Sequence, residues 1–103
     1  MHNIFDCIPE NLDEEIFQQI VDGDSVTIER IISRGHSSPE SGWYDQDRNE
    51  WVLVLKGEAV LLLEDKSPVN LKAGDFINIP AHKKHRVEWT DQDSETIWLA
   101  VHY

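Results

Sequence analysis

The chain has 103 residues, 40% of them hydrophobic, a size and composition that predict one globular domain. Twenty acidic residues against nine basic ones give a formal charge of −11, which argues against binding to nucleic acid or anionic membrane surfaces. Cys7 is the one cysteine, so no internal disulfide can form. No apolar run approaches the ~18 residues of a membrane span, and no signal-peptide pattern opens the chain. We therefore expect a cytoplasmic protein.

Residues 1–24 are expected to form an N-terminal extension that contains one short helix. Pro9 closes an extended lead-in, and Asn11 suits the cap position of a helix over residues 12–21. Acidic residues at 13–15 would lie in its first turn, where the helix dipole favours them. Apolar side chains would share one face, and that face would pack on a sheet.

Residues 25–103 show the pattern of short strands. Apolar or alternating runs occur at 25–33, 51–55, 59–63, 69–71, 76–79, 85–89 and 96–102. A long polar loop, residues 35–49, follows the first run, and glycine or aspartate turns separate the others. The sequence Lys56–Gly57–Glu58 between two apolar runs is typical of a hairpin turn. Some seven or eight strands at this spacing favour an all-β barrel or sandwich.

Two of these runs carry apolar residues at successive positions instead of alternate ones, namely 51–55 and 60–63. Strands of this kind are buried on both faces, but a small barrel covers only the inner one. Either the N-terminal helix or a second copy of the chain must cover the outer face. We expect a homodimer, with coverage by the helix alone as the alternative.

Two spacings connect these strands to a known family. Glu50 and Gly57 are separated by six residues, and Gly74, Pro80 and His85 follow one another at intervals of five and four intervening residues. The pattern resembles the two motifs of the cupin superfamily. The resemblance covers residues 25–103 and implies a single antiparallel β-barrel of the jelly-roll type.

The chain departs from the cupin pattern at several positions. The slots for two histidines of the first motif hold Trp43 and Asp45, or Tyr44 and Gln46, depending on the spacer. In the second motif, His82 and Trp89 replace a glycine and an asparagine. Metal-binding cupins use three histidines and one glutamate. Only Glu50 and His85 match that set.

The strand pattern predicts that Glu50 and His85 meet inside the barrel. A buried glutamate is costly unless it is paired, hydrogen-bonded or bound to metal. One interpretation is a divalent metal (Zn, Fe, Mn or Ni) held by Glu50, His82 and His85, with Asp45 or His36 as a further ligand. The other is a simple hydrogen bond between Glu50 and His85.

A ligand pocket is expected around this pair. Its candidate residues are Trp43, Tyr44, Asp45, Glu50, His85 and Trp89. Aromatic rings at 43 and 44 could stack on a planar or sugar-like ligand. The cations at 83, 84 and 86 either attract an anionic metabolite or belong to a solvated turn.

Three functional hypotheses remain open from the sequence. The first is a small cupin-domain protein that binds or senses a small metabolite, anionic or sugar-like. The second is a metal-dependent enzyme, an oxygenase or isomerase, acting on a small organic acid or sugar. The third is a purely structural dimer module, which leaves the polar groups on the pocket side unexplained.

Overall fold

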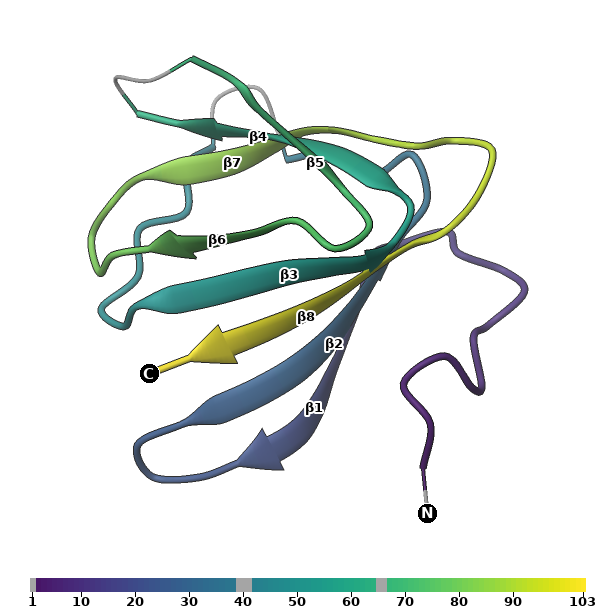
Figure 1. The fold of residues 1–103 in the computed structure, drawn as a ribbon, viewed down its shortest axis with the longest axis horizontal. Helices are drawn as coiled ribbons and strands as arrows, with labels where there is room; N and C mark the ends of the chain where they lie inside the picture. Colours follow the sequence, from purple (N-terminus) through teal and green to yellow (C-terminus); the bar gives the residue numbers. More distant parts are fainter. Residues whose placement is uncertain (1, 39–41, 65–66) are drawn as a thin grey trace.

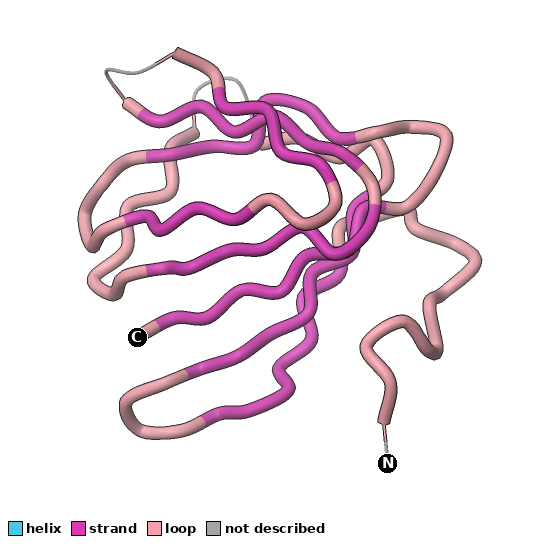
Figure 2. The backbone as a smooth tube through the Cα atoms, in the orientation of Figure 1, coloured by secondary structure: helices cyan, strands magenta, loops and turns pink. Residues whose placement is uncertain are grey.

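The computed structural model describes residues 2–38, 42–64 and 67–103, and within these ranges the secondary structure is entirely β (Figures 1 and 2). The strands are β1 (Ile16–Asp22), β2 (Thr27–Ser33), β3 (Glu50–Lys56), β4 (Glu58–Leu63), β5 (Val69–Lys72), β6 (Phe76–Ile79), β7 (His85–Thr90) and β8 (Thr96–His102). The predicted all-β class is confirmed. The predicted turn at 65–68 lies partly outside the described residues.

Two antiparallel sheets face each other. The larger has the order β1-β2-β8-β3-β6 and the smaller the order β5-β4-β7. In Figure 1 the smaller sheet lies above the larger one, and the chain passes between the two several times. This is the jelly-roll arrangement that the cupin resemblance implied.

The predicted N-terminal helix is wrong, because residues 16–22 form strand β1. Phe17 pairs with Ile31 of β2 in antiparallel register, and a bulge follows between Gln19 and Val21. The amide of Gly23 donates to the carbonyl of Val26 at 2.8 Å and closes the turn into β2. An apolar repeat this short is compatible with the period of a helix and with that of a strand. Pairing with β2 therefore outweighs a weak helix preference.

The predicted hairpin at Lys56–Gly57–Glu58 is also wrong. Strands β3 and β4 belong to different sheets, so the chain crosses from one sheet to the other at this corner. Gly57 has φ +90°, and a Cβ atom there would lie 2.5 Å from the Thr96 hydroxyl oxygen. A glycine marks the corner because no other residue fits the backbone angle and the close approach of β8.

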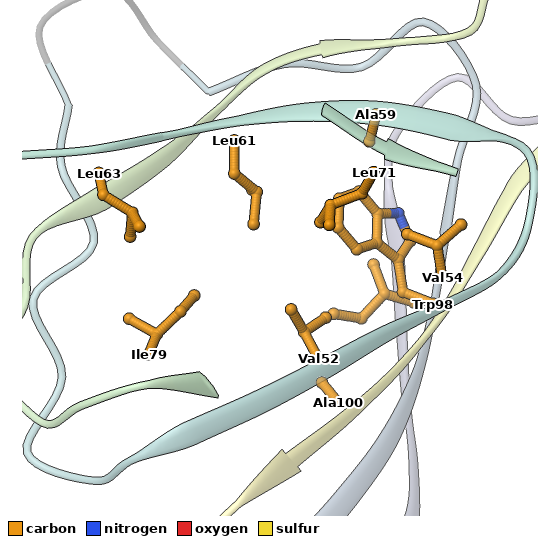
Figure 3. Close-up of a cluster of buried hydrophobic side chains, with 10 residues drawn as sticks. Val52, Val54, Ala59, Leu61, Leu63, Leu71, Ile79, Trp98 and Ala100 are labelled. Carbon is orange, nitrogen blue, oxygen red and sulfur yellow. The ribbon is translucent and has the colours of Figure 1, made fainter. Parts of the chain in front are cut away.

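The core fills the space between the two sheets. Figure 3 shows Leu61 and Leu63 of β4 opposite Val52 of β3 and Ile79 of β6. The buried set is Ile31, Val52, Val54, Ala59, Leu61, Leu63, Leu71, Ile79, Trp98 and Ala100. Burial of each large aliphatic side chain contributes about 1.5–3 kcal/mol, so this layer fixes the distance between the sheets.

The outer face of the large sheet is also largely apolar. The register of strands β3, β6 and β8 places on it Trp51, Leu53, Lys56, Phe76, Asn78, Ile97, Leu99 and Val101. The N-terminal segment covers its β2 side, where Arg30 donates to the carbonyls of Ile4 and Asp6 at 3.0 and 2.6 Å. Phe76, which is 64% exposed, shows that the β6 side remains open.

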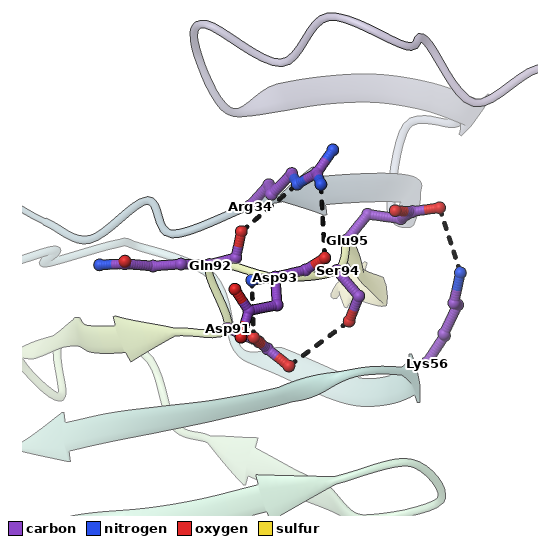
Figure 4. A network of polar contacts seen from close by, with 7 residues as sticks. All are labelled: Arg34, Lys56, Asp91, Gln92, Asp93, Ser94 and Glu95. Atoms are coloured by element: carbon purple, nitrogen blue, oxygen red, sulfur yellow. Dashed lines mark hydrogen bonds and ion pairs between the residues drawn. The ribbon is translucent and has the colours of Figure 1, made fainter.

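The loop between β7 and β8 closes one end of the barrel through polar contacts (Figure 4). The Asp91 side chain accepts from the amide of Asp93 at 2.9 Å and from the Ser94 hydroxyl at 3.4 Å. Arg34 donates to the carbonyls of Gln92 and Asp93, at 3.4 and 3.3 Å. This end, which we call the closed end, consists of residues 91–95 and the corner at Gly57.

Candidate functional site

A cavity of ≈ 70 Å³ opens between the sheets toward the other end of the barrel. One water needs roughly 10–15 Å³ of such room, so the cavity holds more than a single water. Its walls are formed by Glu15, Phe17, Glu29, Ile31, Tyr44, Gln46, Glu50, Val52, Leu61, Ile79, His85, Val87, Trp98 and His102. The apolar members belong mostly to the core, and three of the polar members, Glu50, His85 and His102, stand where strands β3, β7 and β8 begin or end.

Glu50 and His85 face each other in this cavity. Each is the first residue of its strand, β3 and β7, and they are only 8% and 5% exposed. His85 Nε2 lies 3.5 Å from Glu50 Oε1, longer than the ~2.9 Å of an ordinary N–H···O hydrogen bond. The structure thus brings together the two residues that match the cupin motifs.

The pKa of His85 is raised above its ordinary value of 6.5. Burial by itself would lower this pKa, because it penalises the charged imidazole. The contact with the Glu50 carboxylate, the hydrogen bond to the Lys83 carbonyl at 2.9 Å and the charge of Glu50 more than offset that effect. Folding therefore favours the protonated imidazole next to Glu50.

A second histidine–glutamate pair lines the same cavity and was not predicted. His102 Nε2 lies 2.9 Å from Glu29 Oε1, and both side chains are mostly buried, at 16% and 17% exposure. His102 is also the cross-strand partner of Glu50. The four residues therefore form an alternating row, His85–Glu50–His102–Glu29, across three neighbouring strands and β7. The sequence signal that could have indicated this pair is a polar residue at an inward-facing position of β2 and another of β8.

Tyr44 and Gln46 form the loop side of the cavity. Tyr44 pairs with His85 through two backbone hydrogen bonds, of 2.7 and 3.1 Å, and its ring lies 5.6 Å from the imidazole. Burial raises the pKa of Tyr44, as do the charges of Glu15 and Glu50, while a hydrogen bond with Ser38 lowers it, so the hydroxyl stays protonated at neutral pH. The side-chain oxygen of Gln46 is buried without a hydrogen-bond partner among the described residues.

Glu15 enters the cavity from the N-terminal side. The Ser33 hydroxyl donates to Glu15 Oε2 and accepts from the Trp98 indole at 3.2 Å. This chain of contacts holds a carboxylate beside an aromatic wall. Trp98, expected from the sequence as a core residue, is both a core residue and part of the cavity wall.

Four other predicted site residues do not line this cavity. Trp43 is 40% exposed, and Asp45 pairs with His82 at 3.0 Å on the surface. His82 has a left-handed backbone, with φ +64°, and its side chain is 70% exposed. Trp89 is 40% exposed because a bulge at Glu88 shifts the register of β7, so that Val87 faces inward and Trp89 outward.

The expected metal set is not assembled by these contacts. Among residues 2–38, 42–64 and 67–103, no group of three or more His, Cys, Asp or Glu side chains is arranged to hold a metal ion. Glu50 and His85 converge, but His82 is bonded to Asp45, and His36 to the Arg34 amide and the Asp13 carbonyl. The residues present do not fit a cupin metal centre.

The cations near His85 also lie outside the cavity lining. Lys84 is 3.9 Å from Glu64 on the surface. Arg86 donates to the Ser38 carbonyl at 3.2 Å and lies 3.6 Å from Glu88. Neither Lys84 nor Arg86 belongs to the described residues that line the cavity.

The chain belongs to the cupin domain family, since the family model of the cupin domain matches residues 31–102. A curated relative, an uncharacterized protein of Methanocaldococcus jannaschii, is 26% identical over 80 residues, which cover 77% of this chain and 66% of the relative. Among the described residues, no helix is long and apolar enough to cross a membrane.

Solved structures agree with this family. A protein of Ralstonia eutropha described as a "putative mannose-6-phosphate isomerase" is 43% identical, with a TM-score of 0.96 over 99% of this chain and 95% of that one. A cupin superfamily protein of Desulfitobacterium hafniense is 22% identical, with a TM-score of 0.76 over 92% of this chain and 82% of that one. The second likeness concerns the fold alone.

Proposed function

We propose that this protein binds a small polar metabolite in the cavity between its sheets. The observation that carries the proposal is the Glu50–His85 pair, which is buried, faces the cavity and is held at 3.5 Å. A buried carboxylate without a short hydrogen bond is expensive. A ligand that donates to it would lower that cost, so the pair is better suited to binding than to closing the core.

A carbohydrate or related hydroxyl compound is the ligand class that fits best. The cavity combines polar side chains, among them Glu50 and His85, with apolar walls formed by Val52, Leu61 and Trp98. Tyr44 offers a ring face beside His85, suited to the C–H face of a sugar. The similarity to the Ralstonia protein supports a sugar-related ligand.

A thermal-shift screen with sugars, polyols and hydroxy acids tests this proposal. Ligands that bind only the folded protein raise its melting temperature in proportion to ln(1 + [L]/Kd). We expect at least one compound to raise the melting temperature of the wild type and not of Glu50→Ala. A screen in which every compound leaves the wild type unchanged would overturn the proposal.

Metal-dependent catalysis is the competing function, and elemental analysis distinguishes it. Protein purified without a metal-affinity tag is expected to carry far less than one equivalent of Zn, Fe, Mn or Ni, because His82 and His36 are committed elsewhere. Near-stoichiometric metal that disappears in both Glu50→Ala and His85→Ala would establish the metal enzyme instead.

We also infer a homodimer through the outer face of the large sheet. Apart from Lys56 at the end of β3, the positions of β3, β6 and β8 on that face carry no charged side chain, in a chain whose formal charge is −11. Two copies would repel each other over more acidic surfaces. Sedimentation equilibrium should give a dimer for the wild type and for Val60→Glu on the other sheet, and a monomer for Leu53→Glu. A monomeric wild type would contradict the inference.

A further inference from the structure

We propose that the cavity selects an uncharged polyhydroxyl compound and rejects its phosphorylated form. The inference rests on the proposed function and specifies its ligand. It departs from the phosphorylated substrate in the description of the Ralstonia protein, and its basis is the chemistry of the cavity wall itself.

The first argument is a surplus of hydrogen-bond acceptors. Oε1 of Glu50 and Oε1 of Glu29 each contact a histidine, at 3.5 and 2.9 Å. The second oxygen of each carboxylate has no hydrogen-bond partner among the described residues. Gln46 adds an oxygen that is fully buried without a partner in the described part of the chain, whereas the carboxylate oxygens remain accessible to solvent. Three acceptors that line one cavity suit a ligand with several donors, and hydroxyl groups supply them.

Three donors of the protein itself are already engaged at this site. The Trp98 indole donates to Ser33, and the Ser33 hydroxyl donates to Glu15. His85 Nδ1 contacts the Lys83 carbonyl. The donors that remain in the described lining for the oxygens of a phosphate or carboxylate ligand are the Gln46 amide group and the second ring nitrogen of His102.

The second argument is electrostatic. Glu15, Glu29 and Glu50 line the cavity with His85 and His102, and no Lys or Arg lies among the described lining residues. Even with both imidazoles protonated, three negative charges oppose two positive ones. A phosphate would bring nearly two further negative charges into a poorly solvated space, and like charges brought together in this way cost several kcal/mol.

The row of alternating residues places a carboxylate beside each imidazole of the cavity wall. His85 and Glu50 meet at the starts of β7 and β3, and Glu50 lies opposite His102, which contacts Glu29. Each imidazole faces one oxygen of a carboxylate, at 3.5 Å for Glu50 and 2.9 Å for Glu29. The row thus offers carboxylate acceptors from two strands, β2 and β3, on either side of His102 in β8.

Isothermal titration with matched pairs tests the proposal. The probes are glycerol against glycerol 3-phosphate, dihydroxyacetone against its phosphate, and mannose against mannose 6-phosphate, at one fixed ionic strength. The wild type is expected to bind at least one unphosphorylated member about tenfold or more tightly than its phosphate. In Glu50→Gln and in Glu29→Gln that preference should shrink, because a cavity charge is lost. In Glu64→Gln, which removes one negative charge at the surface near Lys84, it should persist.

Each outcome decides the question. A phosphorylated member that binds the wild type as tightly as its partner, or more tightly, overturns this inference and leaves the proposed function standing. If the preference for the unphosphorylated ligand shrinks as much in Glu64→Gln as in Glu50→Gln, it arises from the net charge of the protein and not from the cavity. That result would also overturn the inference. If no probe of either kind binds, this inference fails together with its polyhydroxyl ligand class, and the proposed function is then decided by the broader thermal-shift screen.

Discussion

The two ends of the barrel are both polar, but they differ in how completely their polar groups are paired. At the closed end, both oxygens of Asp91 accept hydrogen bonds, and Lys56 lies 3.1 Å from Glu95 (Figure 4). At the cavity end, Glu50 has one contact of 3.5 Å, and Gln46 keeps a buried oxygen without a partner among the described residues. Polar groups that satisfy one another stabilise a fold, whereas converging acceptors in surplus indicate a place for a ligand.

The packing of the closed end gives the largest expected effect. Gly57→Ala should destabilise the protein by about 2–4 kcal/mol, because the residue has φ +90° and its new Cβ would meet the Thr96 hydroxyl at 2.5 Å. Urea denaturation measures the free energy of unfolding. Gly74→Ala is the matched control, with φ +94° and no atom within 4 Å of its Cβ. It should cost about 1 kcal/mol from strain alone. Equal losses in the two variants would show that Gly57 is not tightly packed.

The second prediction concerns pH and the cavity end. Because the pKa of His85 is raised in the folded state, its protonation stabilises the protein fully below about pH 6.5 and loses this effect as the pH rises through the folded pKa. In Glu50→Gln, the pKa of His85 should fall, since the carboxylate that favours the imidazolium is gone. Histidine ring chemical shifts in an NMR titration measure this directly. An unchanged pKa in the variant would mean that Glu50 does not act on His85.

The same titration extends to stability. The free energy of unfolding of the wild type should decrease from pH 6.5 upward more steeply than that of Glu50→Gln, because only the wild type gains from the raised pKa of His85. Parallel curves from the two proteins, measured in urea at a series of pH values, would contradict the linkage.

The smallest effect is expected at the surface of the closed end. The pKa of Glu95 is lowered by a hydrogen bond to its own backbone amide and by Lys56, but the side chains of this ion pair are exposed. Exposed pairs contribute little, so Glu95→Gln should change the free energy of unfolding by under about 0.5 kcal/mol. A loss above 1 kcal/mol, on the order of a buried hydrogen bond, would mean that this ion pair stabilises the fold more than an exposed pair does.

Much of the fold could be predicted from local patterns. Strands β3 to β8 follow apolar runs between glycine and proline turns, and the strand β6, Phe76–Ile79, has the predicted bounds. The errors at β1 and at Gly57 have a common cause. Residue patterns indicate which segments can be strands, but long-range pairing decides whether a short apolar repeat becomes a strand and which sheet receives it.

The candidate site was predictable only where a motif marked it. Glu50 and His85 stand at spacings typical of cupins, and the structure brings them together. Glu29 and His102 belong to no such spacing and lie 73 positions apart, so only the sheet register makes them neighbours. Trp89 faces outward because of a bulge, and an insertion of one residue leaves no mark on an alternating pattern.

A direct test of the account compares one ligand across three proteins by isothermal titration. The ligand is the sugar or polyol that raises the melting temperature of the wild type most, and the proteins are the wild type, Glu50→Gln and the surface control Glu64→Gln. A hydrogen bond to a charged group contributes about 1.5–3 kcal/mol. We therefore predict equal affinity for the wild type and Glu64→Gln, and affinity about tenfold or more weaker for Glu50→Gln. Equal affinity in all three would contradict the claim that the cavity at Glu50 is the binding site.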